Sequence, residues 1–349
     1  MPHIPREPER FEALQWLGRI CHIEGRTLHD PASIDSLLAA VREKLVEVIT
    51  DPVRLSGLVH ESIFENTVIE LGQAKFLKRE DTGSVYADTT ALDGVKPPDF
   101  RVTLHDDRRL LVEVKAHKTS FEPGKGLKIP KKEFARQIEY AQRAGGELWF
   151  ATFWEGIEEW TLNAPTDFRR KGKDYVIDVG PALKANCMAL LGDVSVATVP
   201  PLRMRIVADP DKPRQLDDLG LAEFTIGRVD LFCNGELIED PAGSTLAFYM
   251  FMFGKWDAPK SDVELDGRDL VAVNWTVEPI ECVEDQELQI VGTASSMYAR
   301  MFKVFATDEQ GRYNKLCLPA TQGRMRRITP PDFPFGESAL RLWIFEQRQ

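Results

Sequence analysis

The chain has 349 residues, of which 43% are hydrophobic and 28% are charged, and its formal net charge is -11. These values are typical of a soluble globular protein with enough apolar material for a core, and the length favours two domains. The chain has no run of about 18 apolar residues and no apolar segment behind a basic N-terminus, so the sequence predicts neither a membrane-spanning nor a secreted protein and favours a cytoplasmic location.

Cysteine and histidine patterns exclude the common soft-metal sites. The five cysteines are scattered, odd in number and without a CxxC pair, and the six histidines show no ligand spacing. Reduced thiols are therefore expected rather than disulfides or a zinc site. A site made of carboxylates, which suits hard cations, is the metal site that the sequence leaves open.

Two helices are predicted at the N-terminus, over residues 9–24 and 33–49. Ser33 is the expected N-cap of the second helix, and its apolar residues recur at helical spacing. We interpret residues 1–50 as a helical segment packed on the next domain, with an interaction surface as the alternative. The predicted apolar stripe consists of Ile34, Leu37, Leu38, Val41, Leu45 and Val48.

The next predicted helix begins at Pro52, runs to about Leu71 and ends at Gly72, a residue suited to a helix C-terminus. Glu61 and Glu65 are four residues apart and therefore lie on one face of this helix. Both could be solvated helix acids, because acids are common near helix N-termini.

A β-hairpin is predicted over residues 97–117, after a short strand near residues 75–79 and a variable loop over residues 80–96. Its strands run from Asp99 to His105 and from residue 109 to residue 116. Because side chains alternate along a strand, Glu113 and Lys115 share one face of a strand that is otherwise apolar. A carboxylate and an ammonium on a buried face require partners, so this pair needs an explanation.

A divalent cation supplies that explanation. Asp99 can meet Glu113 across the strand pair and provide two oxygen ligands for Mg²⁺, with the carbonyl of Val114 as a third. Lys115 would then orient or deprotonate an attacking water, or stabilise charge on a phosphate. The alternative is an ordinary amphipathic hairpin with a surface ion pair.

Basic residues follow the hairpin directly. Residues 96–143 hold twelve basic and seven acidic residues, a local charge of +5 that leaves -16 for the rest of the chain. This segment predicts either a loop that grips phosphates or a solvated run of charges. The lysines expected to contact nucleic acid are Lys118, Lys125, Lys128 and Lys131, with Lys132 beside them.

A helix over residues 131–145 and a buried strand over residues 147–154 complete the predicted order helix, strand, strand, strand, helix, strand. This order of helices and strands, together with the motifs Pro98-Asp99 and Glu113-Val114-Lys115, resembles the PD-(D/E)xK nuclease superfamily. Within that superfamily, the stretch over residues 55–155 resembles archaeal-type Holliday-junction resolvases and Mrr-like restriction enzymes. The resemblance implies a restriction-endonuclease-like α/β core with Glu61 as the favoured helical ligand.

The same resemblance singles out Gln137 as an active-site polar group. Members of the RecB-like branch place a Gln and a Tyr four residues apart on this helix, whereas Gln137 and Tyr140 are three apart here, so the match to that branch fails by one residue.

The core is expected to continue to about residue 200, where a Pro/Asp-rich stretch marks a domain boundary. Residues 201–349 show short apolar segments between turn residues, among them 245–254 and 298–307, and predict a mainly-β sandwich or barrel. Asn234-Gly235 and Gln310-Gly311 are the expected hairpin turns. This domain shows no catalytic pattern, so recognition, assembly and sensing all remain open.

The sequence thus predicts a Mg²⁺-dependent endonuclease that hydrolyses DNA, with Mn²⁺ as a substitute metal, acting in restriction or defence, recombination or transposition. Homo-oligomers or a multi-protein complex are the expected assembly. Two alternatives stay open: a nuclease for RNA or branched junctions, and a nuclease-like module that binds nucleic acid or assembles without cutting.

Overall fold

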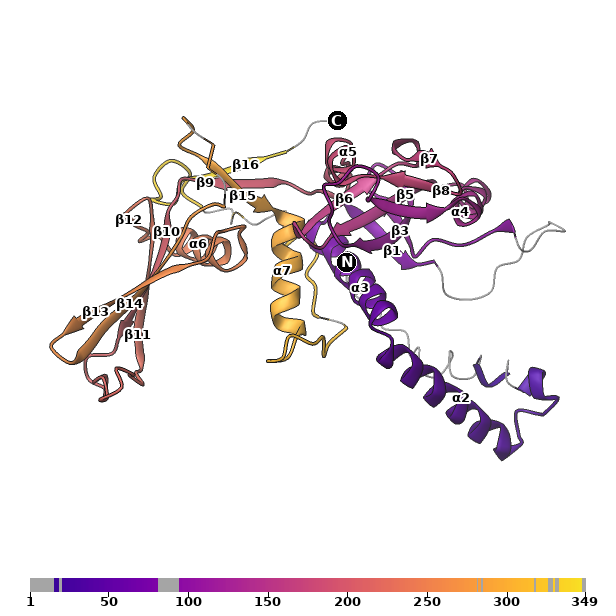
Figure 1. The fold of residues 1–349 in the computed structure, drawn as a ribbon, viewed down its shortest axis with the longest axis horizontal. Coiled ribbons are helices and arrows are strands. Elements are labelled where there is room, and N and C mark those ends of the chain that lie inside the picture. Colours follow the sequence, from indigo (N-terminus) through magenta and orange to yellow (C-terminus); the bar gives the residue numbers. More distant parts are fainter. Residues whose placement is uncertain are drawn as a thin grey trace.

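The computed structural model describes residues 16–18, 21–80, 94–280, 282–283, 285–316, 318–325, 329 and 333–346. These residues form a mixed α/β structure with four sheets (Figure 1). Among them, no helix combines the length and apolar character needed to cross a membrane.

The first sheet has five strands, and α-helices cover both of its faces. Its neighbouring strands are antiparallel, except that β3 and β5 run parallel. Apolar side chains on one face of β3 pack with α3, and those on the other face pack with α4. In spatial order the strands are β1 (Ala74–Arg79), β2 (Phe100–Leu104), β3 (Arg109–His117), β5 (Glu147–Trp154) and β6 (Glu159–Asn163), with helices α3 (Pro52–Leu71) and α4 (Lys131–Ala144).

The predicted order of helix, three strands, helix and strand is confirmed for this region. Asp51 caps α3, Pro52 opens it, and Gly72 ends it in the left-handed region at φ 78°, where glycine carries no steric penalty. The hairpin turn lies between β2 and β3 as predicted, with Asp107 at φ 71°. Residues 81–93 of the predicted variable loop lie outside the described residues.

A small three-stranded sheet packs outside α4, and the sequence did not predict its arrangement. Its inner side lies on the helix, where the rings of Phe134 and Tyr175 stack with centroids 4.0 Å apart. The strand order is β4 (Leu127–Pro130), β8 (Asp174–Ile177) and β7 (Arg169–Lys171). Short helical turns follow at η2 (Pro165–Asp167), α5 (Val179–Lys184) and η3 (Met188–Leu191).

The predicted second helix is observed as α2 (Pro31–Thr50), but it is capped by Asp30 rather than Ser33. Its apolar stripe is largely exposed, with Leu38 at 61% and Leu45 at 56% exposure. The prediction that this apolar stripe packs on the core is therefore wrong. The helix α2 contacts α3 and projects away from the first sheet (Figure 1). Of the predicted helix over residues 9–24, residues 16–18 and 21–24 are helical, and the remainder lies outside the described residues.

The C-terminal half contains the two remaining sheets, which are antiparallel throughout. In the part of the chain that the structure describes, they do not close into a barrel, so the barrel prediction is wrong. One sheet has the order β12 (Glu236–Leu237), β11 (Ile226–Cys233), β10 (Leu202–Ala208), β14 (Asp269–Val277) and β13 (Lys260–Asp266), and the other has the order β15 (Gln289–Thr293), β9 (Ser195–Thr198) and β16 (Leu342–Phe345).

Two segments that were predicted as strands are helices, α6 (Pro241–Phe253) and α7 (Ala294–Ala306). In α6 a continuous apolar run hides the helical period, and such runs do not distinguish a buried helix from a buried strand. The caps were the missed signal, because Asp240 accepts from the backbone N–H of Gly243 and Thr293 accepts from that of Ser296.

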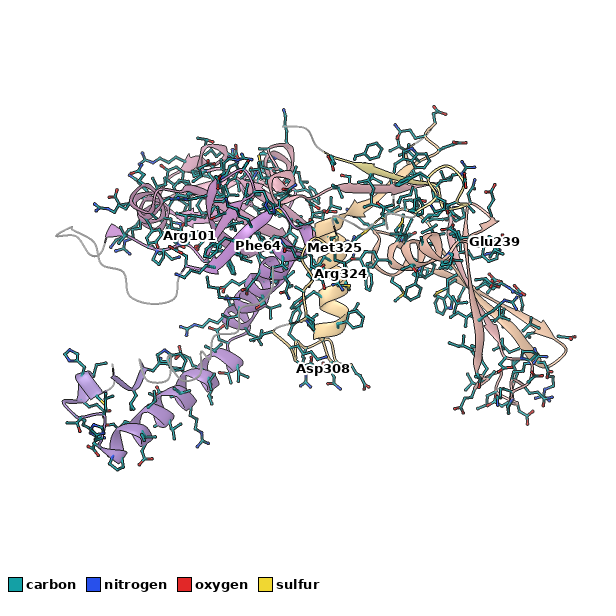
Figure 2. All side chains as sticks on the ribbon, turned by 180° about the vertical axis from the view of Figure 1, so that it is seen from behind. Phe64, Arg101, Glu239, Asp308, Arg324 and Met325 are labelled. Carbon is teal, nitrogen blue, oxygen red and sulfur yellow. The ribbon has the colours of Figure 1, made fainter. Side chains whose placement is uncertain are left out.

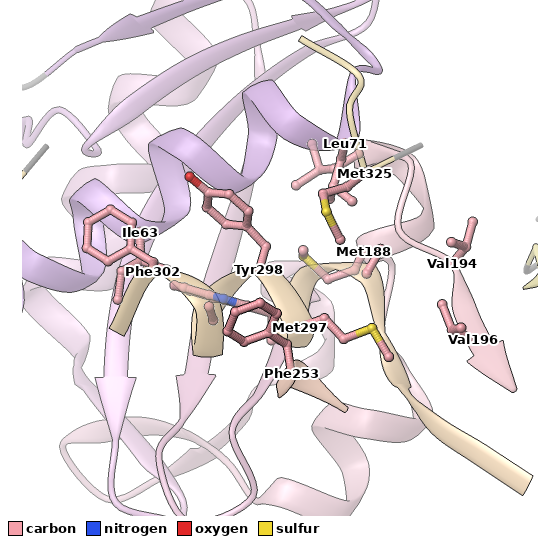
Figure 3. Packing of buried hydrophobic residues seen from close by; sticks show 14 of the residues in the cluster. Ile63, Leu71, Met188, Val194, Val196, Phe253, Met297, Tyr298, Phe302 and Met325 are labelled. Carbon is pink, nitrogen blue, oxygen red and sulfur yellow. The ribbon is translucent and has the colours of Figure 1, made fainter. Parts of the chain in front are cut away.

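The helix α7 packs against α3 and joins the C-terminal half to the first sheet. Tyr298 and Phe302 of α7 lie with Ile63 and Leu71 of α3 in one buried cluster (Figure 3). The segment with Arg324 and Met325 returns to the same helix near Phe64 (Figure 2). The division into segments 1–50, 51–200 and 201–349 stays a prediction.

Candidate active site

The centre of the candidate site is the ion pair of Glu113 and Lys115 on the face of β3 that looks toward α4. Glu113 is 1% exposed, and its Oε1 lies 2.5 Å from Nζ of Lys115. Burial alone would lower the pKa of Lys115, but Glu113 raises it above the ordinary lysine value. Lys115 is therefore a protonated donor.

Asp99 lies beside this pair at the start of β2. Phe100 is paired with Val112, so the next position places Asp99 across from Glu113. Its Oδ2 accepts from the backbone N–H of Val114 at 2.6 Å. Burial, and then the negative charge of Glu113, raise the pKa of Asp99 to about 8. The two carboxyl groups thus lie close enough to oppose each other's ionisation, and a cation shared between them stays a prediction.

Lys96 and Glu133 complete the ionic cluster, and sequence reasoning missed both. Nζ of Lys96 lies 3.2 Å from Oε1 of Glu113 and 2.6 Å from Oε1 of Glu133. Glu133 also lies 3.7 Å from Nζ of Lys115. Glu133 stands in the first turn of α4, four residues before Gln137, a spacing that could have indicated a shared helix face.

Several buried polar atoms on the same side of the sheet have no hydrogen-bond partner among the described residues. They are Oε2 of Glu113, Nδ1 of His117, both amide atoms of Gln137 and the hydroxyl of Thr152. Thr152 of β5 is paired with Lys115, and His117 follows two residues later on β3, so these groups share the Lys115 face. Buried polar groups are nearly always paired, so this group of atoms indicates a place for water, a metal ion or substrate.

The predicted helical ligand Glu61 forms an ion pair, and its role as a metal ligand stays a prediction. Its Oε2 is 3.0 Å from Arg79, which also binds Glu65 at 2.7 Å. Glu61 still contributes to the raised pKa of Asp99. Within the described residues, no group of three or more His, Cys, Asp or Glu side chains could hold a metal ion. The structure therefore brings Asp99 and Glu113 together but leaves Glu61 in a separate ion pair.

The predicted phosphate-binding lysines are exposed and lie along one side of the site. Lys118 follows β3, Lys128 lies on β4, and Lys131 opens α4. Lys125 is paired with Glu122 at 2.6 Å. These positions lead outward from the buried cluster, since α4 carries both Lys131 and Glu133.

Comparison with known proteins gives distant structural likenesses. No family model and no curated protein matches this chain. Among solved structures, a Holliday junction resolvase of the archaeal hyperthermophile Archaeoglobus fulgidus is similar over 31% of this chain and 80% of its own, with 18% identity and a TM-score of 0.24. A likeness at that TM-score is too distant to establish fold or function.

Proposed function

We propose that this protein is a metal-dependent nuclease that hydrolyses phosphodiester bonds of DNA. The observation that carries the proposal is the buried cluster of Asp99, Glu113 and Lys115, in which one carboxylate oxygen is unpaired among the described residues and a second carboxyl group has its pKa raised to about 8. Two buried acids next to one protonated amine are costly in isolation, and a bound cation would offset that cost.

The residues present fit a hard divalent cation. Mg²⁺ needs only one or two protein carboxylates and keeps several waters, so Asp99 and Glu113 suffice, with the carbonyl of Val114 as a further oxygen. Glu61 would join them if Arg79 released it. Mg²⁺, or Mn²⁺ in its place, would supply Lewis acidity to the phosphate.

The protein's own groups hold the reacting atoms. Because the raised pKa keeps Lys115 protonated, it serves as a donor to the attacking water or to a phosphate oxygen, and it is not the base that removes the proton. Gln137 and Thr152 have unpaired donors and acceptors on the same side of the sheet and would orient water there. In the reaction, water attacks phosphorus, the bond from phosphorus to the leaving oxygen breaks, and the proton that the water loses reaches the leaving oxygen by way of solvent.

The test compares Lys115→Met with Lys184→Met, a control at an exposed lysine on α5. We expect the control to nick plasmid DNA like the unmodified protein in Mg²⁺, and Lys115→Met to lose at least ~100-fold in rate, the effect of removing one preorganised donor. Equal nicking by both variants would remove Lys115 from the mechanism.

A second measurement separates the metal site from the activity. Binding of Mn²⁺, followed by its paramagnetic resonance signal, should weaken strongly in Asp99→Asn and Glu113→Gln and persist in Lys115→Met. Protein that binds DNA but neither takes up Mn²⁺ nor cuts DNA, RNA or a branched junction would favour the non-enzymatic module.

A further inference from the structure

The small sheet outside α4 brings two basic segments together that are about forty residues apart in the sequence. In its register Lys128 is paired with Val176, and Val176 with Arg169, while Asp174 is paired with Lys171. Directly paired residues share a face of a sheet, so Lys128, Arg169 and Lys171 project from the same outer face. The opposite face holds Tyr175, which stacks on α4.

The first turn of α4 directly follows β4 at the end of this sheet. The backbone N–H of Lys131 donates to the carbonyl of Lys173 at 2.9 Å and thereby joins α4 to the turn between β7 and β8. A hollow of about 580 Å³ lies at this junction, with Lys131, Lys132 and Lys173 in its wall. We call the exposed set the basic ridge, which consists of Lys128, Lys131, Lys132, Arg169, Lys171 and Lys173.

Two glycines hold the preceding loop tightly against this sheet. A Cβ at Gly126 would overlap the carbonyl oxygen of Ile177, and one at Gly124 would overlap Nζ of Lys171. Asp178 fixes the loop further, because its Oδ1 accepts from the backbone N–H of both glycines at 2.9 and 3.0 Å. The Lys171 ammonium thus lies directly against this loop.

The five lysines of the basic ridge differ from most basic residues of the described chain in that no described carboxylate forms an ion pair with them. Arg169 pairs with Asp178, but no described acid forms an ion pair with any of the five lysines. In the sheet of the C-terminal half, by contrast, Arg205, Arg228 and Lys260 each bind a carboxylate. Five ammonium groups that form no ion pair within the described residues, in a chain with net charge -11, indicate a surface for an anionic partner.

The basic ridge also leads to the buried cluster. Lys131 and Lys132 lie next to Glu133 in the first turn of α4, and Glu133 contacts both Lys96 and Lys115. The first turn of α4 thus carries residues of both the basic ridge and the ionic cluster.

We propose that the basic ridge is a phosphate-binding surface that holds the backbone of double-stranded DNA beside the cluster of Asp99, Glu113 and Lys115. The proposal rests on the proposed nuclease function and adds β7, β8 and their turn to the substrate surface. Lysines on such a surface position the duplex without reading its sequence.

The test measures binding of a fluorescent 30-base-pair duplex in EDTA, where binding is separated from metal-dependent cutting. The variant Lys128→Ala/Lys171→Ala is compared with the charge-matched control Lys212→Ala/Lys260→Ala, which changes an exposed lysine of the loop after β10 and a lysine of β13. Loss of two phosphate contacts should reduce the steepness of the plot of log affinity against log salt concentration by about 1.8. The ratio of the affinity of the unmodified protein to that of the variant should therefore fall about tenfold between 50 and 200 mM salt. The control should keep the slope of the unmodified protein, and Lys128→Arg/Lys171→Arg should restore it.

The outcomes distinguish the two proposals. Unchanged affinity and slope in a Lys128→Ala/Lys171→Ala protein with an unchanged melting temperature would overturn the basic ridge, even if the protein cuts DNA in Mg²⁺. A reduced slope together with equal nicking by Lys115→Met and the unmodified protein would keep the basic ridge and overturn the proposed mechanism. Failure of the unmodified protein to bind the duplex at 50 mM salt would overturn the basic ridge as a DNA surface.

Discussion

Nζ of Lys115 lies 2.5 Å from Oε1 of Glu113, two residues earlier on the same face of β3. The contact orients the ammonium toward the acids while Oε2 of Glu113 stays unpaired among the described residues. One oxygen of the carboxylate thus positions the lysine and the other is available to a cation.

The first prediction concerns Lys115→Arg. A guanidinium is larger and planar and forms different hydrogen bonds, so it does not replace an ammonium in a confined site. We expect Mn²⁺ binding within about threefold of the unmodified protein and a DNA cleavage rate at least ~10-fold lower. Full activity in Lys115→Arg would show that positive charge alone is sufficient and that the position of the donor is not important.

The second prediction concerns Lys96, whose Nζ contacts both Glu113 and Glu133. An ammonium and a divalent ion a few ångströms apart repel by about 2 kcal/mol even in water. Lys96→Ala should therefore bind Mn²⁺ about tenfold more tightly, measured by titration at low salt, whereas Lys184→Ala should bind it like the unmodified protein. Weaker binding in Lys96→Ala would mean that Lys96 organises the carboxylates rather than competing for them.

The sequence was sufficient to predict the buried centre of the site. Strand alternation placed Glu113 and Lys115 on one face, and hairpin pairing brought Asp99 across from them. Lys96 and Glu133 could not be predicted in the same way, because their contacts depend on how α4 docks on the sheet. The pairing of Glu61 with Arg79 depends likewise on the tertiary contact between α3 and β1.

The fold was predictable where the spacing of apolar residues agreed with the residue types that begin and end a helix. Pro52 and Gly72 bound α3 as expected, since each residue type has a backbone reason for its position. In α6 and α7 the apolar runs favoured strands, and only the caps Asp240 and Thr293 indicated helices. In the small sheet of the basic ridge, β4 is hydrogen-bonded to β8. These two strands are far apart in the sequence, and no local sequence pattern indicates that they pair.

The third prediction concerns the ion pair between Glu70 and Arg324, which connects α3 to the C-terminal part of the chain. Glu70 is fully buried and accepts from Nε of Arg324 at 2.9 Å and from the backbone N–H of Thr321 at 2.7 Å. Arg324→Ala would leave this carboxylate without its cation and should lower the free energy of unfolding in urea by about 3 kcal/mol.

Glu70→Gln provides the matched comparison. The amide oxygen can still accept from Thr321, and Arg324 is 48% exposed and can be hydrated, so we expect a smaller loss of about 1 kcal/mol. In Glu70→Gln/Arg324→Ala the losses should be less than additive. Additive losses would show that the two side chains stabilise the protein independently.

The fourth prediction is a pH dependence of stability that comes from Asp193. This carboxylate is buried between β9 and α7, where it accepts from the hydroxyl of Ser295 at 2.6 Å and from its backbone N–H at 2.9 Å. Burial outweighs these hydrogen bonds and raises the pKa of Asp193 from 3.8 to about 6. Between these values the folded protein keeps a proton that the unfolded chain has released, so the free energy of unfolding should fall as pH rises from about 4 to about 6.

Asp193→Asn isolates this contribution, because the amide oxygen can still accept from Ser295 and carries no charge. A shift of this size corresponds to about 3 kcal/mol, so the variant should gain about that much relative to the unmodified protein between pH 4 and pH 7 in urea unfolding experiments. Glu159, whose pKa burial raises to about 7, remains in both proteins and continues to lower their stability with rising pH. A difference between the two proteins that is the same at pH 4 and pH 7 would show that Asp193 ionises alike in the folded and unfolded chains.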